Sequence, residues 1–93
     1  MIIKLSKEYL FEGKSYTEVD LDLESLTGAD IEAAEQTAVM TTGTGLTNFA
    51  EFCKPFQIAL AARAAKQPVE FIRKMPAKDC SKITLAVGNF LVG

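Results

Sequence analysis

The stretch IIKLSKEYLFEGKSYTEVDLDL, residues 2–23, contains two runs of β-branched and aromatic residues separated by a short EGK segment. Two such runs with a turn signal between them predict a β-hairpin. Apolar side chains recur at odd positions of both runs, namely Ile3, Leu5, Tyr9, Phe11, Val19, Leu21 and Leu23. Because side chains alternate between the two faces of a strand, the hairpin is expected to have one apolar and one polar face.

The length of the loop decides the register of this hairpin. A two-residue loop of Glu12 and Gly13 would pair odd with even positions and set Leu5 opposite Asp20. A three-residue loop pairs odd with odd positions and places both apolar rows on one face. Gly13 would then take the left-handed position of a type I turn with a bulge. We therefore predict a loop of odd length.

A lone hairpin is marginally stable in water, so its apolar face needs a cover, which the following helices can provide. The segment LTGADIEAAE, residues 26–35, has the signals of a helix start, with Thr27 as the N-cap and Asp30 as its capping-box partner. This helix is expected over residues 28–40 and should pack on the hairpin. Its narrow apolar stripe consists of Ile31, Ala34 and Ala38.

Three prolines divide the second half of the chain, and three further helices are expected over residues 55–66, 69–75 and 77–92. The last of them has the clearest apolar stripe, formed by Ile83, Ala86, Val87 and Phe90. The length and the pattern together predict one α+β domain, residues 1–93. In this domain the N-terminal β-hairpin packs on a small bundle of three to four short helices.

The charges are unevenly distributed along the chain, although the formal net charge is only −2. Residues 1–47 carry three basic and nine acidic side chains, a net of −6, whereas residues 48–93 carry seven basic and three acidic ones, a net of +4. Either the two halves fold against each other with complementary fields, or a basic helical face meets an acidic partner. The acidic overall balance argues against a dedicated nucleic-acid-binding domain.

The sequence has few of the residue types that catalysis requires. It contains no histidine, and Cys53 and Cys80 form no CxxC motif. The TGTG segment, residues 42–45, lacks the lysine of a phosphate-binding loop and is interpreted as a linker. We expect no enzymatic activity, no catalytic residue, no cofactor and no metal site. The two isolated thiols are expected to be reduced and buried. Together with the lack of a signal peptide and of a long apolar span, they predict a cytoplasmic protein.

Several apolar side chains, among them Phe49, Phe52, Phe71 and Leu91, lie off the clean core faces. In a small domain this much unassigned apolar surface indicates an oligomer interface or a groove for a partner. The alternative is that short helices in a small fold need wide apolar faces. The candidate partner-binding residues are Phe49, Phe52, Phe71, Met75, Phe90 and Leu91.

Two segments carry a resemblance to a known family, FEGKSYTEVDLDLESLTGADIEAAE (11–35) and IALAARAAKQPVEFIRKMPAKDCSKITLAVGNFLVG (58–93). Through the order and spacing of the motifs in these two segments, the chain resembles the Mu-like phage tail assembly chaperones. These are small proteins encoded upstream of the tape-measure protein in tailed phages and prophages. The resemblance covers most of the chain and is weakest over residues 40–54.

The resemblance implies a non-enzymatic protein of the bacterial host cytoplasm. Such proteins bind the long, helical, aggregation-prone tape-measure protein during tail assembly, help to recruit tail-tube subunits, and are absent from the finished virion. The family has no agreed catalytic residues to carry over. The expected partners are the tape-measure protein and the tail-tube protein, with a homo-oligomer as a further option and neither nucleic acid nor membrane. The alternatives are a minor structural subunit of the phage tail or head and a small nucleic-acid-binding regulator.

Overall fold

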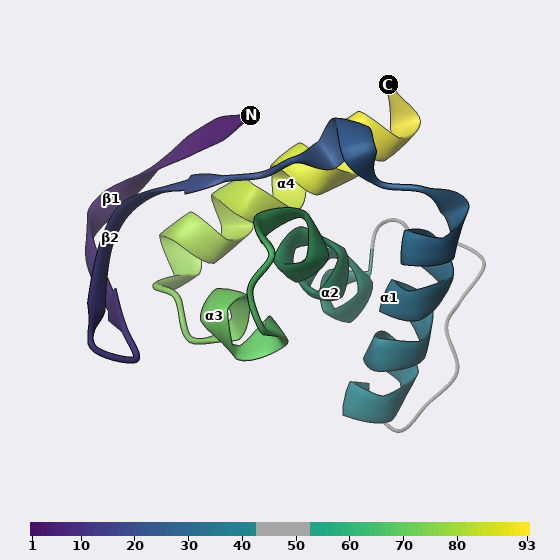
Figure 1. Ribbon diagram of the computed structural model, residues 1–93, viewed down its shortest axis with the longest axis horizontal. Helices are drawn as coiled ribbons and strands as arrows, with labels where there is room; N and C mark the ends of the chain where they lie inside the picture. Colours follow the sequence, from purple (N-terminus) through teal and green to yellow (C-terminus); the bar gives the residue numbers. More distant parts are fainter. Residues whose placement is uncertain (43–52) are drawn as a thin grey trace.

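The computed structural model describes residues 1–42 and 53–93. An antiparallel hairpin is followed by helices, so the predicted α+β class is confirmed (Figure 1). The elements in chain order are β1 (Ile2–Phe11), β2 (Lys14–Asp20), the 3-10 helix η1 (Leu23–Ser25), α1 (Gly28–Thr42), α2 (Lys54–Ala65), α3 (Val69–Arg73) and α4 (Ala77–Val92). The second strand thus ends before Leu21 and Leu23, of which Leu21 is buried in the connection that follows and Leu23 is buried within η1.

The hairpin turn has two residues, so the predicted loop of odd length is wrong. Glu12 and Gly13 both have positive φ, at 50° and 80°, and Phe11 pairs with Lys14. Two consecutive residues with positive φ form a type I′ turn, whose twist matches that of the flanking strands. Glycine adopts this conformation without a steric cost, which is why the shorter loop forms at this position.

A register shift within the hairpin brings the two apolar rows together in spite of the short loop. Near the turn Tyr9 pairs with Tyr16, but further along Ile3 pairs with Val19, and the shift lies between Lys4 and Tyr9 on β1. Odd positions therefore pair with even positions beside the turn and with odd positions beyond the shift. This irregularity places Tyr9 and Val19, both buried, on the inner face of the same hairpin.

Helix α2 lies at the centre of the helical bundle, with α1, α3 and α4 packed around it (Figure 1). Its buried residues are Phe56, Gln57, Ala59, Leu60, Ala61, Ala62 and Ala64. The alanines let neighbouring helices approach closely, and α1 contributes the fully buried Ala34 and Ala38. Because the small-residue stripe of α1 fits these alanines, α1 packs against α2, and the expectation that it covers the hairpin is wrong.

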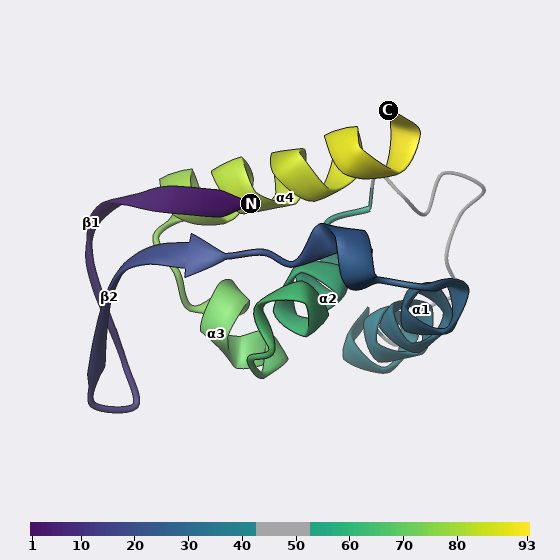
Figure 2. The same ribbon diagram turned by 45° about the horizontal axis from the view of Figure 1, so that its top comes forward.

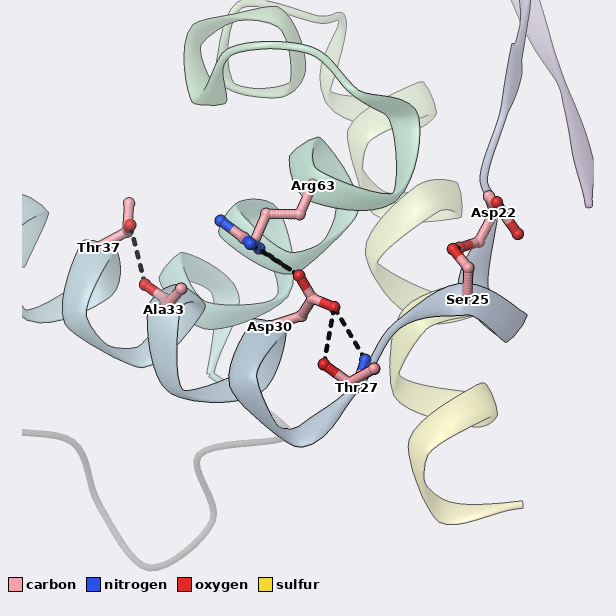
Figure 3. A network of polar contacts seen from close by, with 7 residues as sticks. All are labelled: Asp22, Ser25, Thr27, Asp30, Ala33, Thr37 and Arg63. Carbon is pink, nitrogen blue, oxygen red and sulfur yellow. Dashed lines mark hydrogen bonds and ion pairs between the residues drawn. The ribbon is translucent and has the colours of Figure 1, made fainter.

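The start of α1 is tied to α2 by a network around Asp30 (Figure 3). One Asp30 oxygen accepts hydrogen bonds from the backbone N–H of Thr27 at 2.9 Å and from its hydroxyl at 3.2 Å. The other oxygen accepts from Nε and Nη2 of Arg63 on α2, at 2.9 and 2.7 Å. The predicted role of Asp30 at the helix start is confirmed, and the same carboxylate also joins α1 to α2.

The buried carboxylate of Asp79 joins α4 to the hairpin. Asp79 lies in the first turn of α4, and its oxygens accept hydrogen bonds from the backbone N–H of Ser6 at 2.8 Å and from the Ser6 hydroxyl at 3.0 Å. About one turn further on, Lys82 Nζ donates to the carbonyl oxygen of Lys4 at 2.8 Å. These bonds satisfy polar backbone groups of β1 and hold the strand along α4 (Figure 2).

We predict that Asp79→Ala lowers the free energy of unfolding by about 1.5–3 kcal/mol, because it removes two hydrogen bonds to an ionised group. Ser6→Ala is the matched control, since it removes the hydroxyl donor and leaves the bond from the backbone N–H intact. Urea unfolding followed by circular dichroism measures both losses. An Asp79→Ala loss no larger than that of Ser6→Ala would show that the backbone bond contributes nothing.

Asp30 makes stability depend on pH. Hydrogen bonds from the Thr27 backbone and from Arg63 hold the pKa of Asp30 below its ordinary value of 3.8. A lowered folded-state pKa stabilises the protein above the unfolded pKa of about 3.9, and this stabilisation is lost as the pH falls from there through the folded pKa. The difference in unfolding free energy between wild type and Asp30→Asn should therefore shrink below about pH 4. Urea unfolding from neutral pH down to acidic pH tests this, and a constant difference contradicts it.

Candidate partner-binding surface

The structure distributes the six predicted partner-binding residues over three environments. Phe49 and Phe52 lie outside the described residues, as does most of the TGTG segment. Phe71 and Met75 are buried, with exposed fractions of 1% and 6%, so neither side chain is available to a partner in this conformation. The expectation that Phe71 lies off the core is wrong.

Phe71 is buried because the hairpin covers it with aromatic side chains. Its ring centroid lies 5.5 Å from that of Tyr9, 5.2 Å from that of Phe11 and 4.9 Å from that of Tyr16, each in an edge-to-face arrangement. The Tyr9 hydroxyl also donates to the Phe71 carbonyl oxygen at 2.8 Å. Such aromatic pairs add stability beyond the area that they bury. Phe71 therefore fastens α3 to the tip of the hairpin.

The apolar stripe predicted for α4 is only partly buried. Ile83 and Val87 are fully buried, but Phe90 is 39% exposed, whereas Leu91 is half-buried and packs against the core. The buried face of α4 is turned toward α2, where the fully buried Thr84 accepts a hydrogen bond from Nζ of α2 Lys54 at 2.6 Å. This orientation of α4 brings Leu91 inward and leaves Phe90 at the surface.

Exposed apolar side chains lie on the N-terminal end of β1 and on the C-terminal half of α4, where Leu85 and Val92 share one face of the helix and Phe90 lies on another. Their exposed fractions lie between 39% and 63%, which is high for large apolar residues in a folded chain. We call this region the α4–β1 surface, and it consists of Met1, Ile2, Leu85, Phe90 and Val92.

The two elements of this surface run in opposite directions and are held in register. Ser6 bonds to Asp79, and Lys4 bonds to Lys82 one turn further along α4. Two strand residues advance about 7 Å and one helical turn about 5.4 Å. By this spacing, Ile2 is level with the turn of α4 that follows Lys82 and contains Leu85. Figure 2 shows β1 running alongside α4.

Sequence reasoning missed Leu85, Val92 and Ile2. Leu85 and Val92 are seven residues apart, so their shared helix face was readable from the sequence. The larger stripe on the neighbouring face of the same helix hid this signal. The proximity of Ile2 had no local signal, because it depends on bonds between Ser6 and Asp79, which are 73 positions apart.

The surface is apolar toward the end of α4 and basic toward its beginning. Lys78 and Lys82 are exposed, and Asp79, the only acid in Ala77–Val92, is buried against β1. The exposed face of α4 thus carries positive charge only. An amphipathic segment with acidic residues at one end complements this distribution.

Few side chains among the described residues are of the kinds that catalyse reactions or bind metal ions. Cys53 and Cys80 form no disulfide and are half-buried rather than fully buried. Burial raises the pKa of the Cys80 thiol, although the nearby Lys54 ammonium opposes this, and a raised pKa disfavours the reactive thiolate. Among residues 1–42 and 53–93, no group of three or more His, Cys, Asp or Glu side chains could hold a metal ion. In the same part of the chain, no helix has the length and the apolar character needed to traverse a bilayer.

Comparison with known families identifies the class of the protein. Residues 2–92 match the family described as "Phage tail assembly chaperone proteins, E, or 41 or 14", and the chain therefore belongs to the phage tail assembly chaperones. No curated protein and no solved structure matched the chain. The resemblance noted in the sequence is thus confirmed at the level of the family.

A pair of phenylalanine substitutions tests the division between core and surface. We predict that Phe71→Ala lowers the free energy of unfolding by about 3–5 kcal/mol, because it leaves a cavity among three aromatic rings. Phe90→Ala, which removes the same atoms from a partly exposed position, should cost about 1 kcal/mol or less. Urea unfolding measures both values, and similar losses would contradict the placement of the two side chains.

Proposed function

We propose that this tail assembly chaperone binds the tape-measure protein through the α4–β1 surface and keeps it soluble during tail assembly. The observation that carries the proposal is the set of exposed apolar residues on β1 and α4. Hydrogen bonds from Ser6 to the buried Asp79 hold these two elements together. A tape-measure protein is long, helical and prone to aggregate, and an apolar stripe on such a helix can lie along an exposed apolar surface.

The proposal has no chemical step. The protein acts in the host cytoplasm, covers an apolar segment until the tail tube is built around it, and is absent from the finished virion. Recruitment of tail-tube subunits would follow from holding the tape-measure protein in an accessible form.

Co-expression with the adjacent tape-measure protein tests the proposal. We expect the wild-type chain to raise the soluble fraction of the tape-measure protein and to co-purify with it. Leu85→Asp should abolish both effects, because it places a charge on the exposed apolar face of α4 that Leu85 shares with Val92. Leu10→Asp is the matched control, since Leu10 is 69% exposed at the tip of the hairpin, away from α4, and Leu85 is 63% exposed.

The outcomes separate the function from the surface. A wild-type chain that neither solubilises nor binds the tape-measure protein contradicts the proposed function. Solubilisation that survives Leu85→Asp but not Leu10→Asp keeps the function and moves the contact to the hairpin tip. Recovery of the chain in purified phage particles would favour a structural subunit of the tail.

A further inference from the structure

The two edges of the hairpin differ in how they are covered. Along β1, the Ser6 N–H donates to the Asp79 carboxylate, and the Lys4 carbonyl oxygen accepts from Lys82 Nζ, so side chains of α4 satisfy this edge. Among the described residues, no backbone group outside β1 bonds to the strand Lys14–Asp20. An uncovered strand edge is a template on which a further strand can pair.

The backbone groups of Glu18 and Asp20 point away from β1. The Leu21 N–H donates to the carbonyl oxygen of Met1 at 2.8 Å, and an antiparallel ladder alternates between groups directed toward the partner strand and groups directed outward. The next N–H along the chain does point outward, and it bonds to the carbonyl oxygen of Ala64 at 3.1 Å. The C-terminal end of α2 thus closes the edge at this point and leaves the preceding part of β2 open. We call residues 15–20 the open β2 edge.

A groove follows this edge. Between β2 and the connection from α2 to α3 lies a hollow of about 120 Å³. A second hollow, of about 270 Å³, adjoins it and shares Asp20 and Ala65 with it. The apolar side chains that line the first hollow are Tyr16, Val19, Ala65 and Phe71. A segment that extends along β2 can therefore place small apolar side chains in this hollow.

The open β2 edge is acidic. Residues 15–24 carry four acids and no basic residue, and Glu18 and Asp20 on the edge itself are exposed. The strand β1 supplies one cation beside each of them, with Lys4 opposite Glu18 and the Met1 ammonium 3.5 Å from Asp20. Within the described residues, the only side-chain ion pair between the acidic first half and the basic second half joins α1 to α2, so the helices leave these acids unneutralised. Basic residues on a third strand would repeat the pattern of β1 on the other side of the acids.

Charge decides what can pair with this edge. A second copy would set its own β2 against this one and bring acids opposite acids, which destabilises a cross-strand pair. We propose that the open β2 edge binds an extended basic segment of a partner protein as a third, antiparallel strand. In this segment basic residues alternate with small apolar ones, because alternate side chains face the acids and the hollow.

This contact is separate from the one proposed for the tape-measure protein. Because β1 lies between α4 and β2, the α4–β1 surface and the open β2 edge are on opposite sides of β1 (Figure 2). One chain can therefore hold two partners at once. Failure of either contact in its own test leaves the other contact unaffected.

A peptide titration followed by NMR tests the contact without the tape-measure protein. The probe is a capped peptide of about five residues in which lysine and valine alternate, with lysine at both ends. It should shift the amide signals of residues 15–20 and of the connection from α2 to α3, and it should protect the amides of Glu18 and Asp20 from hydrogen exchange. No shift with up to about 2 mM peptide overturns the proposal.

N-methylation of the peptide separates backbone pairing from charge attraction. In an antiparallel pair, the residues opposite Glu18 and Asp20 exchange both backbone hydrogen bonds with them, so N-methyl groups on the lysines should abolish binding. N-methyl groups on the valines, whose N–H groups point away from β2, are the matched control and should leave binding intact. Binding that survives methylation of the lysines overturns the proposal.

Charge reversal tests the choice of a basic partner. Glu18→Lys/Asp20→Lys should weaken binding of the lysine peptide about tenfold or more and favour a peptide with glutamate in place of lysine, because attractive cross-strand pairs become repulsive. Glu24→Lys/Glu32→Lys changes the net charge equally, at exposed positions on η1 and α1, and should bind like wild type. Equal binding of both peptides by the wild-type chain overturns the proposal, and circular dichroism verifies that each variant is folded.

Discussion

The pair of hydrogen bonds between Ser6 and the Asp79 carboxylate is the contact on which the arrangement of hairpin and helices depends. Ser6 lies where the register of β1 shifts, so its backbone N–H can bond outside the hairpin. Asp79 lies in the first turn of α4, where the helix dipole stabilises a negative charge. A fully buried carboxylate is tolerated only when it is hydrogen-bonded, and this requirement ties β1 to one position along α4.

Packing around α2 determines which side chains reach the surface. The helix is rich in buried alanines, and a Cβ atom at Gly88 of α4 would lie 3.0 Å from Nε2 of α2 Gln57. This close approach turns one face of α4 inward and leaves Leu85 and Val92 outside. The apolar surface of α4 is thus a consequence of how tightly α4 and α2 approach each other.

The α4–β1 surface gives a physical basis for a chaperone that acts by contact alone. Family membership places the chain in phage tail assembly, and the fold presents a surface with exposed apolar side chains and with lysines toward the beginning of α4. The energy for binding at such a surface comes from buried apolar area and from charge pairing.

The sequence by itself determined the α+β class, the family and the starts of the helices. The capping pair Thr27 and Asp30, and prolines such as Pro68 and Pro76 directly before α3 and α4, act on the backbone within a few residues, so a local reading captures them. Among the six predicted partner-binding residues, the described exposed surface contains Phe90, while Leu91 is only partly accessible.

Only the tertiary structure decided the register of the hairpin and the burial of Phe71. Phe71 is covered by Tyr9, which lies 62 positions earlier in the chain, and the shift that pairs Ile3 with Val19 coincides with the bonds from Ser6 to Asp79. Periodicity describes one element at a time, whereas these features depend on which elements meet. Contacts between distant segments therefore selected the core and exposed the candidate site.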